Sequence, residues 1–144
     1  MQVPPAAWWD EAMTSVELIR SAELTDTAPY AYAAVVPAGR TVYTAGACPL
    51  DEQGAIVSPG EVGAQGRQVM ANLVVALAAA GATLDDVARS TVYVASADRA
   101  DLVAAWNVVR AAFGDHDAPS TLLGVAALGY PDQLVEVEAV AVLP

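Results

Sequence analysis

The chain has 144 residues, of which 56% are hydrophobic and only 16% are charged. This length predicts a single domain over residues 1–144, in which residues 1–15 form an N-terminal extension. The 17 acidic residues against six arginines and no lysine give a net charge of -11, which disfavours nucleic acid as a partner. The lack of lysine excludes Schiff-base chemistry through a lysine amine. One cysteine and one histidine exclude an internal disulfide, a cysteine-based zinc site and a histidine cluster for a metal.

The sequence also lacks the features of a targeting segment. It opens without basic residues and reaches acidic residues at Asp10 and Glu11, which is the reverse of the order in a secretory signal peptide. Its most apolar run, residues 69–80, contains Asn72 and is too short to span a bilayer. We expect a cytoplasmic protein that does not bind membranes.

Three strands are predicted in the first third of the chain. Val16–Arg20 has the pattern of a short strand. Tyr30–Val36 and Thr41–Cys48 are rich in β-branched and aromatic residues, which favour strands. The residues between them, Pro37–Arg40, include the proline and the glycine typical of a turn, so we expect these two strands to form a hairpin.

Two helices are predicted further along. Glu61–Ala80 has apolar residues at helical spacing and is followed by Gly81, a typical helix stop. Asp98–Phe113 shows a second apolar stripe and is followed by Gly114. Between them, Leu84–Val87 has the pattern of a one-turn helix.

The remaining strands are predicted at Thr91–Ala95, Thr121–Leu128 and Leu134–Leu143. The resulting order, β-β-β-α-β-α-β-β, predicts an α+β fold with both helices packed on one face of a mixed sheet. The last two strands are apolar on both faces in places, although a sheet covered on one side only should be polar on the other. We therefore expect the second face to pack against other subunits.

Several short motifs stand in a fixed order along the chain: Pro29-Tyr30, Tyr43-Thr44-Ala45-Gly46 followed by Pro49, Gln65-Gly66-Arg67-Gln68 with Asn72, Thr91-Val92-Tyr93-Val94 and Val135-Glu136-Val137-Glu138-Ala139. Together they resemble the RidA/YjgF family, once called endoribonuclease L-PSP, over residues 16–144. The resemblance implies a chorismate-mutase-like fold and a homotrimer, in which three sheets form a central barrel with sites in the clefts between subunits. It also implies the hydrolysis of small enamines and imines to ketoacids and ammonia, with no metal and no cofactor.

One position departs from the family pattern. Deaminating members carry an arginine just before the penultimate strand, and that arginine pairs with the carboxylate of the substrate. Here the position falls on Ser120 or Thr121, the candidate substrate contacts at this point, and neither can form a bidentate ion pair. The nearest arginines in sequence, Arg99 and Arg110, lie on the second predicted helix. This loss argues against short 2-imino acids as substrates.

Glu136 is the candidate catalytic residue, because it matches the water-positioning glutamate of the family. A carboxylate beside a water can deliver that water to a C=N carbon and pass a proton to the nitrogen. The alternative is a structural carboxylate, hydrogen-bonded at a subunit contact. Glu138 points to the same strand face and has the same two interpretations. His116 lies in an acidic loop, where we expect a solvated side chain rather than an acid or base at the lip of the site.

Four further residues are candidates for contacting a substrate. Tyr30 has a ring that could stack on a planar ligand, or it packs at the start of a strand. Asn107 matches a family asparagine near the cleft, or it is a solvent-facing helical amide. Ala45 stands where many relatives have serine. Cys48 could be a nucleophile, but it has no nearby histidine in sequence, and a buried structural thiol is favoured.

The sequence thus predicts a homotrimeric, cofactor-independent hydrolase of a small enamine, imine or related unstable metabolite. The alternative is a non-catalytic trimer that binds a metabolite or acts like a chaperone, which Ala45, Ser120 and Thr121 favour because they remove polar contacts. Ribonuclease activity is disfavoured by the net charge of -11.

Overall fold

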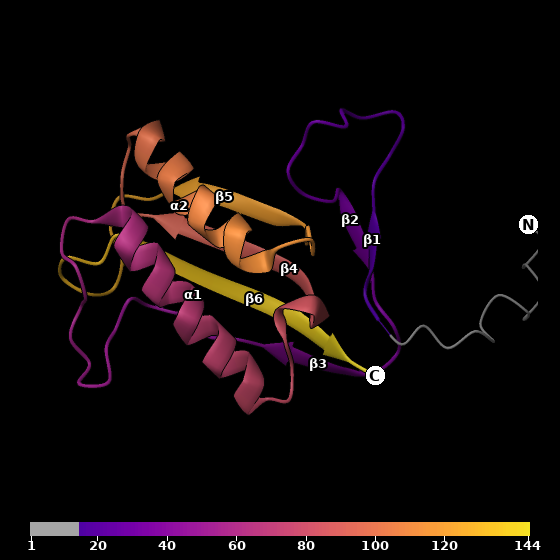
Figure 1. Ribbon diagram of the computed structural model, residues 1–144, viewed down its shortest axis with the longest axis horizontal. Coiled ribbons are helices and arrows are strands. Elements are labelled where there is room, and N and C mark those ends of the chain that lie inside the picture. Colours follow the sequence, from indigo (N-terminus) through magenta and orange to yellow (C-terminus); the bar gives the residue numbers. More distant parts are fainter. Residues whose placement is uncertain (1–14) are drawn as a thin grey trace, which may run out of the picture.

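The computed structural model describes residues 15–144. Most of the predicted N-terminal extension lies outside the described residues. A four-stranded mixed sheet forms one layer, and helices α1 (Val62–Ala79) and α2 (Arg99–Phe113) lie side by side across one face of it (Figure 1). The α+β class, with both helices on one side, is confirmed. Among the residues described, no helix combines the length and apolar character needed to cross a membrane.

The main sheet has the strand order β3-β6-β4-β5. Its strands are β3 (Arg40–Tyr43), β4 (Val87–Val94), β5 (Ser120–Gly124) and β6 (Val135–Leu143). The long strand β6 is antiparallel to both β3 and β4, whereas β4 and β5 are parallel. A parallel pair needs a long crossover connection, which α2 supplies.

The predicted hairpin between residues 30–36 and 41–48 is wrong. Strand β2 (Ala33–Val35) pairs instead with β1 (Glu17–Ile19), and the two form a separate sheet that stands away from the main one (Figure 1). Strand β3 pairs with β6. Gly39 lies against the backbone carbonyl of Leu143, so closely that a Cβ would collide with it. The glycine therefore lets the chain enter beside β6 rather than turn back on β2.

Alternation along β6 determines which side chains face the helices. Its odd-numbered residues from Val135 to Ala141 are buried under α1 and α2, whereas Glu136 and Glu138 are half-buried on the opposite face. Strand β4 shows the same pattern and places Arg89, Thr91 and Tyr93 on that face. We call this uncovered side the open face of the sheet.

Two amides of α1 hold the loops beside the open face. Gln65 is fully buried; its Nε2 donates to the carbonyl of Asp132 at 2.8 Å, and its Oε1 accepts from the N–H of Leu134 at 2.7 Å. Asn72 donates from Nδ2 to the carbonyls of Cys48 and Leu50 at 2.8 and 2.9 Å. Helix α1 thereby fixes both the entry to β6 and the loop after β3.

Candidate functional site

Glu136 lies half-buried on the open face, against the loop that follows β3. Gln133 donates from Nε2 to Glu136 Oε2 at 2.9 Å, and Cys48 Sγ lies 3.6 Å from the same oxygen. Gly46 faces the other oxygen, Oε1, so closely that a side chain there would collide with the carboxylate. Within residues 15–144, Oε1 accepts no hydrogen bond and is therefore the oxygen left for a water or a ligand.

Gln133 is a contributor that the sequence analysis missed. It is buried, and besides Glu136 it bonds the backbone carbonyl of Val135 and the N–H of Tyr130. The turn before it passes through Asp132 at a φ of 62°. These bonds fix the amide before it reaches the carboxylate. The one available signal was an amide three residues before Glu136.

Cys48 is held as a neutral thiol in this cluster. Burial raises the pKa of the thiol, and the nearby negative charge of Glu136 raises it further. The thiolate is the nucleophilic form of cysteine, so this environment disfavours nucleophilic catalysis. The geometry supports a structural thiol that donates toward Glu136.

A cavity of about 460 Å³ opens beside this cluster. Its lining includes Ala45, Gly46 and Cys48 from the loop after β3, together with Asn72 and Tyr130. Ala45 is exposed there and offers only a methyl group. Of the predicted site residues, Cys48 contacts Glu136 directly, and Ala45 lines the same cavity as Cys48.

Three other predicted residues gather in a second cavity of about 360 Å³ at the outer edge of β5. Tyr30, Ser120 and Thr121 line it together with Trp106 of α2. The ring of Tyr30 meets the ring of Trp106 edge-on, with centroids 6.3 Å apart and an interplanar angle of 83°. We call this space the Tyr30 cavity.

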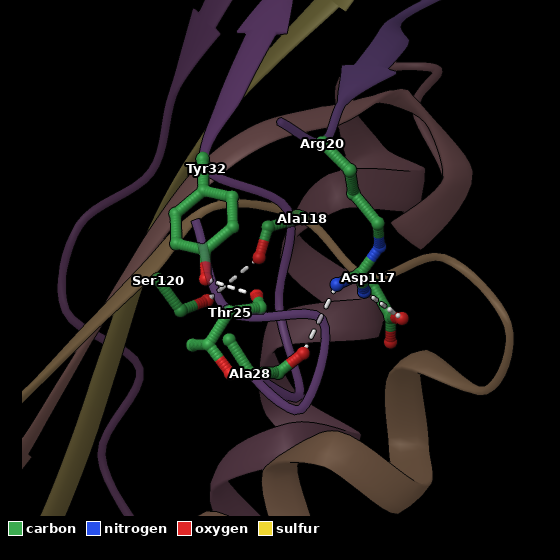
Figure 2. A network of polar contacts seen from close by, with 7 residues as sticks. All are labelled: Arg20, Thr25, Ala28, Tyr32, Asp117, Ala118 and Ser120. Atoms are coloured by element: carbon green, nitrogen blue, oxygen red, sulfur yellow. Dashed lines mark hydrogen bonds and ion pairs between the residues drawn. The ribbon is translucent and has the colours of Figure 1, made fainter. Parts of the chain in front are cut away.

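A polar network holds the segment before Tyr30 against the start of β5. Arg20 pairs with Asp117 at 2.7 Å and donates to the carbonyl of Ala28 at 3.0 Å, as Figure 2 shows. The N–H of Ala31 donates to the carbonyl of Asp117 at 2.8 Å. Ser120 donates to the carbonyl of Ala118 in the same region (Figure 2). The detached β1–β2 sheet is thereby tied to the main body beside the Tyr30 cavity.

The two groups of candidate residues do not meet within one chain. Strand β4 separates β5 from β6, so the backbones of Thr121 and Glu136 lie two strands apart, roughly 10 Å in the direction across the sheet. The two cavities have no lining residue in common. Asn107 joins neither group, because it is exposed in a groove between α1 and α2, in the helix layer.

Glu138 has a partner of its own on the open face. Tyr93 donates from its hydroxyl to Glu138 Oε1 at 2.8 Å, and this hydrogen bond raises the pKa of Tyr93. Together with Arg89 and Thr91, Glu138 lines a small hollow of about 170 Å³.

His116 differs from the expected solvated loop side chain. It is half-buried, its ring stacks on Phe113, and its Nε2 lies 2.7 Å from the carbonyl of Val87. In the described part of the chain, no three His, Cys, Asp or Glu side chains are grouped so as to hold a metal ion.

Comparisons with known proteins agree with this architecture. The family Endoribonuclease L-PSP matches residues 21–143. A RutC family protein of Pyrococcus horikoshii and the 3-aminoacrylate deaminase RutC of Acinetobacter baylyi are each 33% identical over 110 residues, which cover 76% of this chain and 85% of each relative.

Among solved structures, the Rid family protein YyfB of Yersinia pestis superimposes with a TM-score of 0.84 at 33% identity, covering 90% of this chain and 99% of that one. RidA of an Antarctic Psychrobacter species gives a TM-score of 0.65 at 27% identity, covering 88% and 99%. With the family matched over most of its length and its fold shared with Rid proteins, the chain belongs to the endoribonuclease L-PSP family, the RidA/YjgF family of the sequence motifs.

Proposed function

We propose that the protein hydrolyses a small enamine or imine to a carbonyl compound and ammonia, with Glu136 as its catalytic residue. The observation that carries this proposal is the half-buried carboxylate whose Oε2 is held by Gln133 and whose Oε1 lies against Gly46, a residue that lines the neighbouring cavity. The similarity to a relative named 3-aminoacrylate deaminase supports the same class of reaction.

The reaction needs one water and one shuttling carboxylate. Glu136 accepts a proton from the water as the water oxygen adds to the C=N carbon, and it passes this proton to the nitrogen to give a carbinolamine. Glu136 then takes the proton of the carbinolamine hydroxyl and gives it to the amino group, which leaves as ammonia as the C–N bond breaks and the C=O bond forms. In sum, one imine and one water give one carbonyl compound and one ammonia, and the carboxylate is regenerated. The hydrogen bond from Gln133 to Oε2 keeps the carboxylate in place, while Oε1 accepts and then donates the proton.

A homotrimer would complete the site. Within one chain, Glu136 contacts Gly46 and Cys48, which line one cavity, whereas Tyr30 lines another cavity that shares no lining residue with it, so one small ligand is not expected to touch both. A neighbouring copy could bring its Tyr30 cavity to the Glu136 cluster. The open face supports such an assembly, because Tyr43 is 77% exposed and Leu123 is 42% exposed on it.

The test is turnover by Glu136→Gln. Imines are generated in place by an amino-acid oxidase, and the carbonyl product is measured against the uncatalysed rate. We expect the variant to lose at least about 100-fold in rate, as is typical when a general acid–base group is removed. The exposed Glu52 provides the control Glu52→Gln, which should retain the rate. The molar mass in solution, measured by light scattering, should stay that of a trimer in all three proteins. Unchanged turnover in Glu136→Gln would remove the role of this residue.

A non-catalytic metabolite-binding trimer is the second candidate function. Its support is Ser120, whose hydroxyl bonds Ser90 and the carbonyl of Ala118 and so is not free for a substrate. In that case ligands would raise the melting temperature of the protein, while no imine tested would be turned over.

A further inference from the structure

Arg89 brings a guanidinium group to Thr121, one of the two positions at which the family pattern has an arginine and this sequence has none. From β4 it donates through Nη2 to Oγ1 of Thr121, on the neighbouring parallel strand β5, at 3.0 Å. Thr121 in turn lines the Tyr30 cavity. A cation 32 residues away in sequence, which itself lines the hollow beside Glu138, therefore contacts a lining residue of the Tyr30 cavity.

Most donors of the guanidinium have no partner in the described part of the chain. Within residues 15–144 it has no carboxylate within 4.0 Å, and the ion pair found there joins Arg20 and Asp117 instead. Thr121 takes one of the five N–H donors of Arg89. The carboxylate that shares its hollow, Glu138, already accepts from Tyr93.

The local backbone explains why this arginine reaches Thr121. The pairing of β4 with β6 shifts register between Val87 and Arg89, an irregularity of the kind that re-aims a side chain. The two arginines closer in sequence lie elsewhere. Arg99 lines a separate cavity with Gly124 at the far end of β5, and Arg110 is exposed on α2.

We propose that Arg89 binds the carboxylate of the substrate, with Thr121 as its positioning residue, so that the substrate is a small enamine or imine that carries a carboxylic acid. The inference rests on the proposed function and reverses the expectation drawn from the missing family arginine. Strand β4 supplies the cation that Ser120 and Thr121 cannot. Since the chain has a net charge of -11, an anionic ligand needs such a local cation to approach.

The test compares two probes that differ in charge but closely match in shape: 2-oxobutanoate, which resembles a product, and its neutral amide, 2-oxobutanamide. Calorimetric titration should show the wild type binding the acid about tenfold more tightly than the amide, the range of one charge-assisted hydrogen-bonded pair. Arg89→Gln should bind both probes equally, with the affinity for the amide unchanged. Arg89→Lys should give an intermediate preference, because it keeps the charge and loses the fork.

Two controls remove the same charge elsewhere, and a third variant tests the positioning. Arg99→Gln and Arg110→Gln should keep the tenfold preference, and Thr121→Val should weaken it while leaving the melting temperature within the range of the controls. The proposal is overturned if the wild type does not prefer the acid, if Arg89→Gln retains the preference, or if Arg99→Gln abolishes it.

Turnover separates this inference from the proposed function. If acid binding depends on Arg89 but the wild type hydrolyses no imine, Arg89 is a carboxylate-binding residue and the proposed hydrolase activity fails. If the wild type hydrolyses carboxylate-bearing imines and Arg89→Gln has the same KM, the activity stands and the role of Arg89 is refuted.

Discussion

Replacing Gly46 by alanine should move the Glu136 carboxylate while leaving the backbone undisturbed. Gly46 is not among the glycines with positive φ, so its backbone accepts an alanine. The added methyl group, however, would collide with Oε1, Cδ and Cγ of Glu136. The carboxylate must rotate away, and it then loses the hydrogen bond from Gln133 and the contact with Cys48.

The size of the effect follows from those contacts. A hydrogen bond to a charged group contributes about 1.5–3 kcal/mol, and water replaces part of it because Glu136 is only half-buried. Gln133 keeps its bond to the carbonyl of Val135 and is not left unpartnered. We expect a loss of about 1–2 kcal/mol in the free energy of unfolding, or roughly 3–6 °C in Tm for a domain of this size.

Thermal unfolding followed by circular dichroism measures the change. Gly129→Ala is the matched control, since nothing lies within 4 Å of a Cβ at that position and its φ is not positive; its Tm should stay within about 1 °C of the wild type. In the Glu136→Ala background the cost of Gly46→Ala should largely vanish, because the colliding group is gone. Gly46→Ala with wild-type Tm and turnover, or an equal cost in both backgrounds, would refute the reasoning.

Three further outcomes are expected. The absorbance of the Cys48 thiolate at 240 nm should rise with a midpoint above pH 9.0, the usual pKa of the thiol, because burial and Glu136 raise that pKa, and the midpoint should fall in Glu136→Gln; a wild-type midpoint below 9.0 would contradict this. Gln65→Leu leaves two backbone groups of the buried loop before β6 without partners and should lower the free energy of unfolding by about 2–4 kcal/mol, measured in urea; a loss under 1 kcal/mol would show that water replaces the amide. Asp117→Asn breaks the exposed ion pair with Arg20 and should lower the free energy of unfolding by at most about 1 kcal/mol in the same measurement. A larger loss would contradict this, because it would mean that the ion pair stabilises other parts of the fold besides the segment before Tyr30.

The helices could be predicted from the sequence because their signals are local. The predicted range Glu61–Ala80 is one residue longer than α1 at each end, and Asp98–Phe113 is one residue longer than α2 at its start. Asp98 caps α2 by accepting from the N–H of Ala100, and Gly114 follows the last helical residue. Periodicity and caps involve neighbours only a few residues apart, so the sequence contains them directly.

Strand pairing was predicted less well because it depends on distant partners. The β-rich pattern of residues 30–36 and 41–48 gives no information on which strand lies beside which. The hairpin joined the two segments that are closest in sequence, but the strands in them pair elsewhere, β2 with β1 and β3 with β6. The residues of β3 pair with residues about 100 positions away. Strand β4 also begins at Val87, four residues before the predicted start, where Arg89 lies.

For the candidate site too, local features were predictable from the sequence and distant contacts were not. Alternation in β6 was enough to place Glu136 and Glu138 on one face. The partners of these residues were not predictable in this way, since Cys48 is 88 residues from Glu136 and Arg89 is 32 residues from Thr121. Only the folded chain shows that Thr121 has an arginine beside it.

The two edge strands of the main sheet, β3 and β5, affect how readily the protein aggregates. Among residues 15–144, β3 and β5 each have a neighbour on one side only, so each exposes a row of unpaired N–H and C=O groups. Exposed edge strands can pair with strands of other chains, and repeated pairing of this kind produces fibres. Here β3 has four residues and β5 has five, so an added strand would gain only about two or three backbone bonds. The short borders therefore protect a chain rich in apolar residues against edge-to-edge polymerisation.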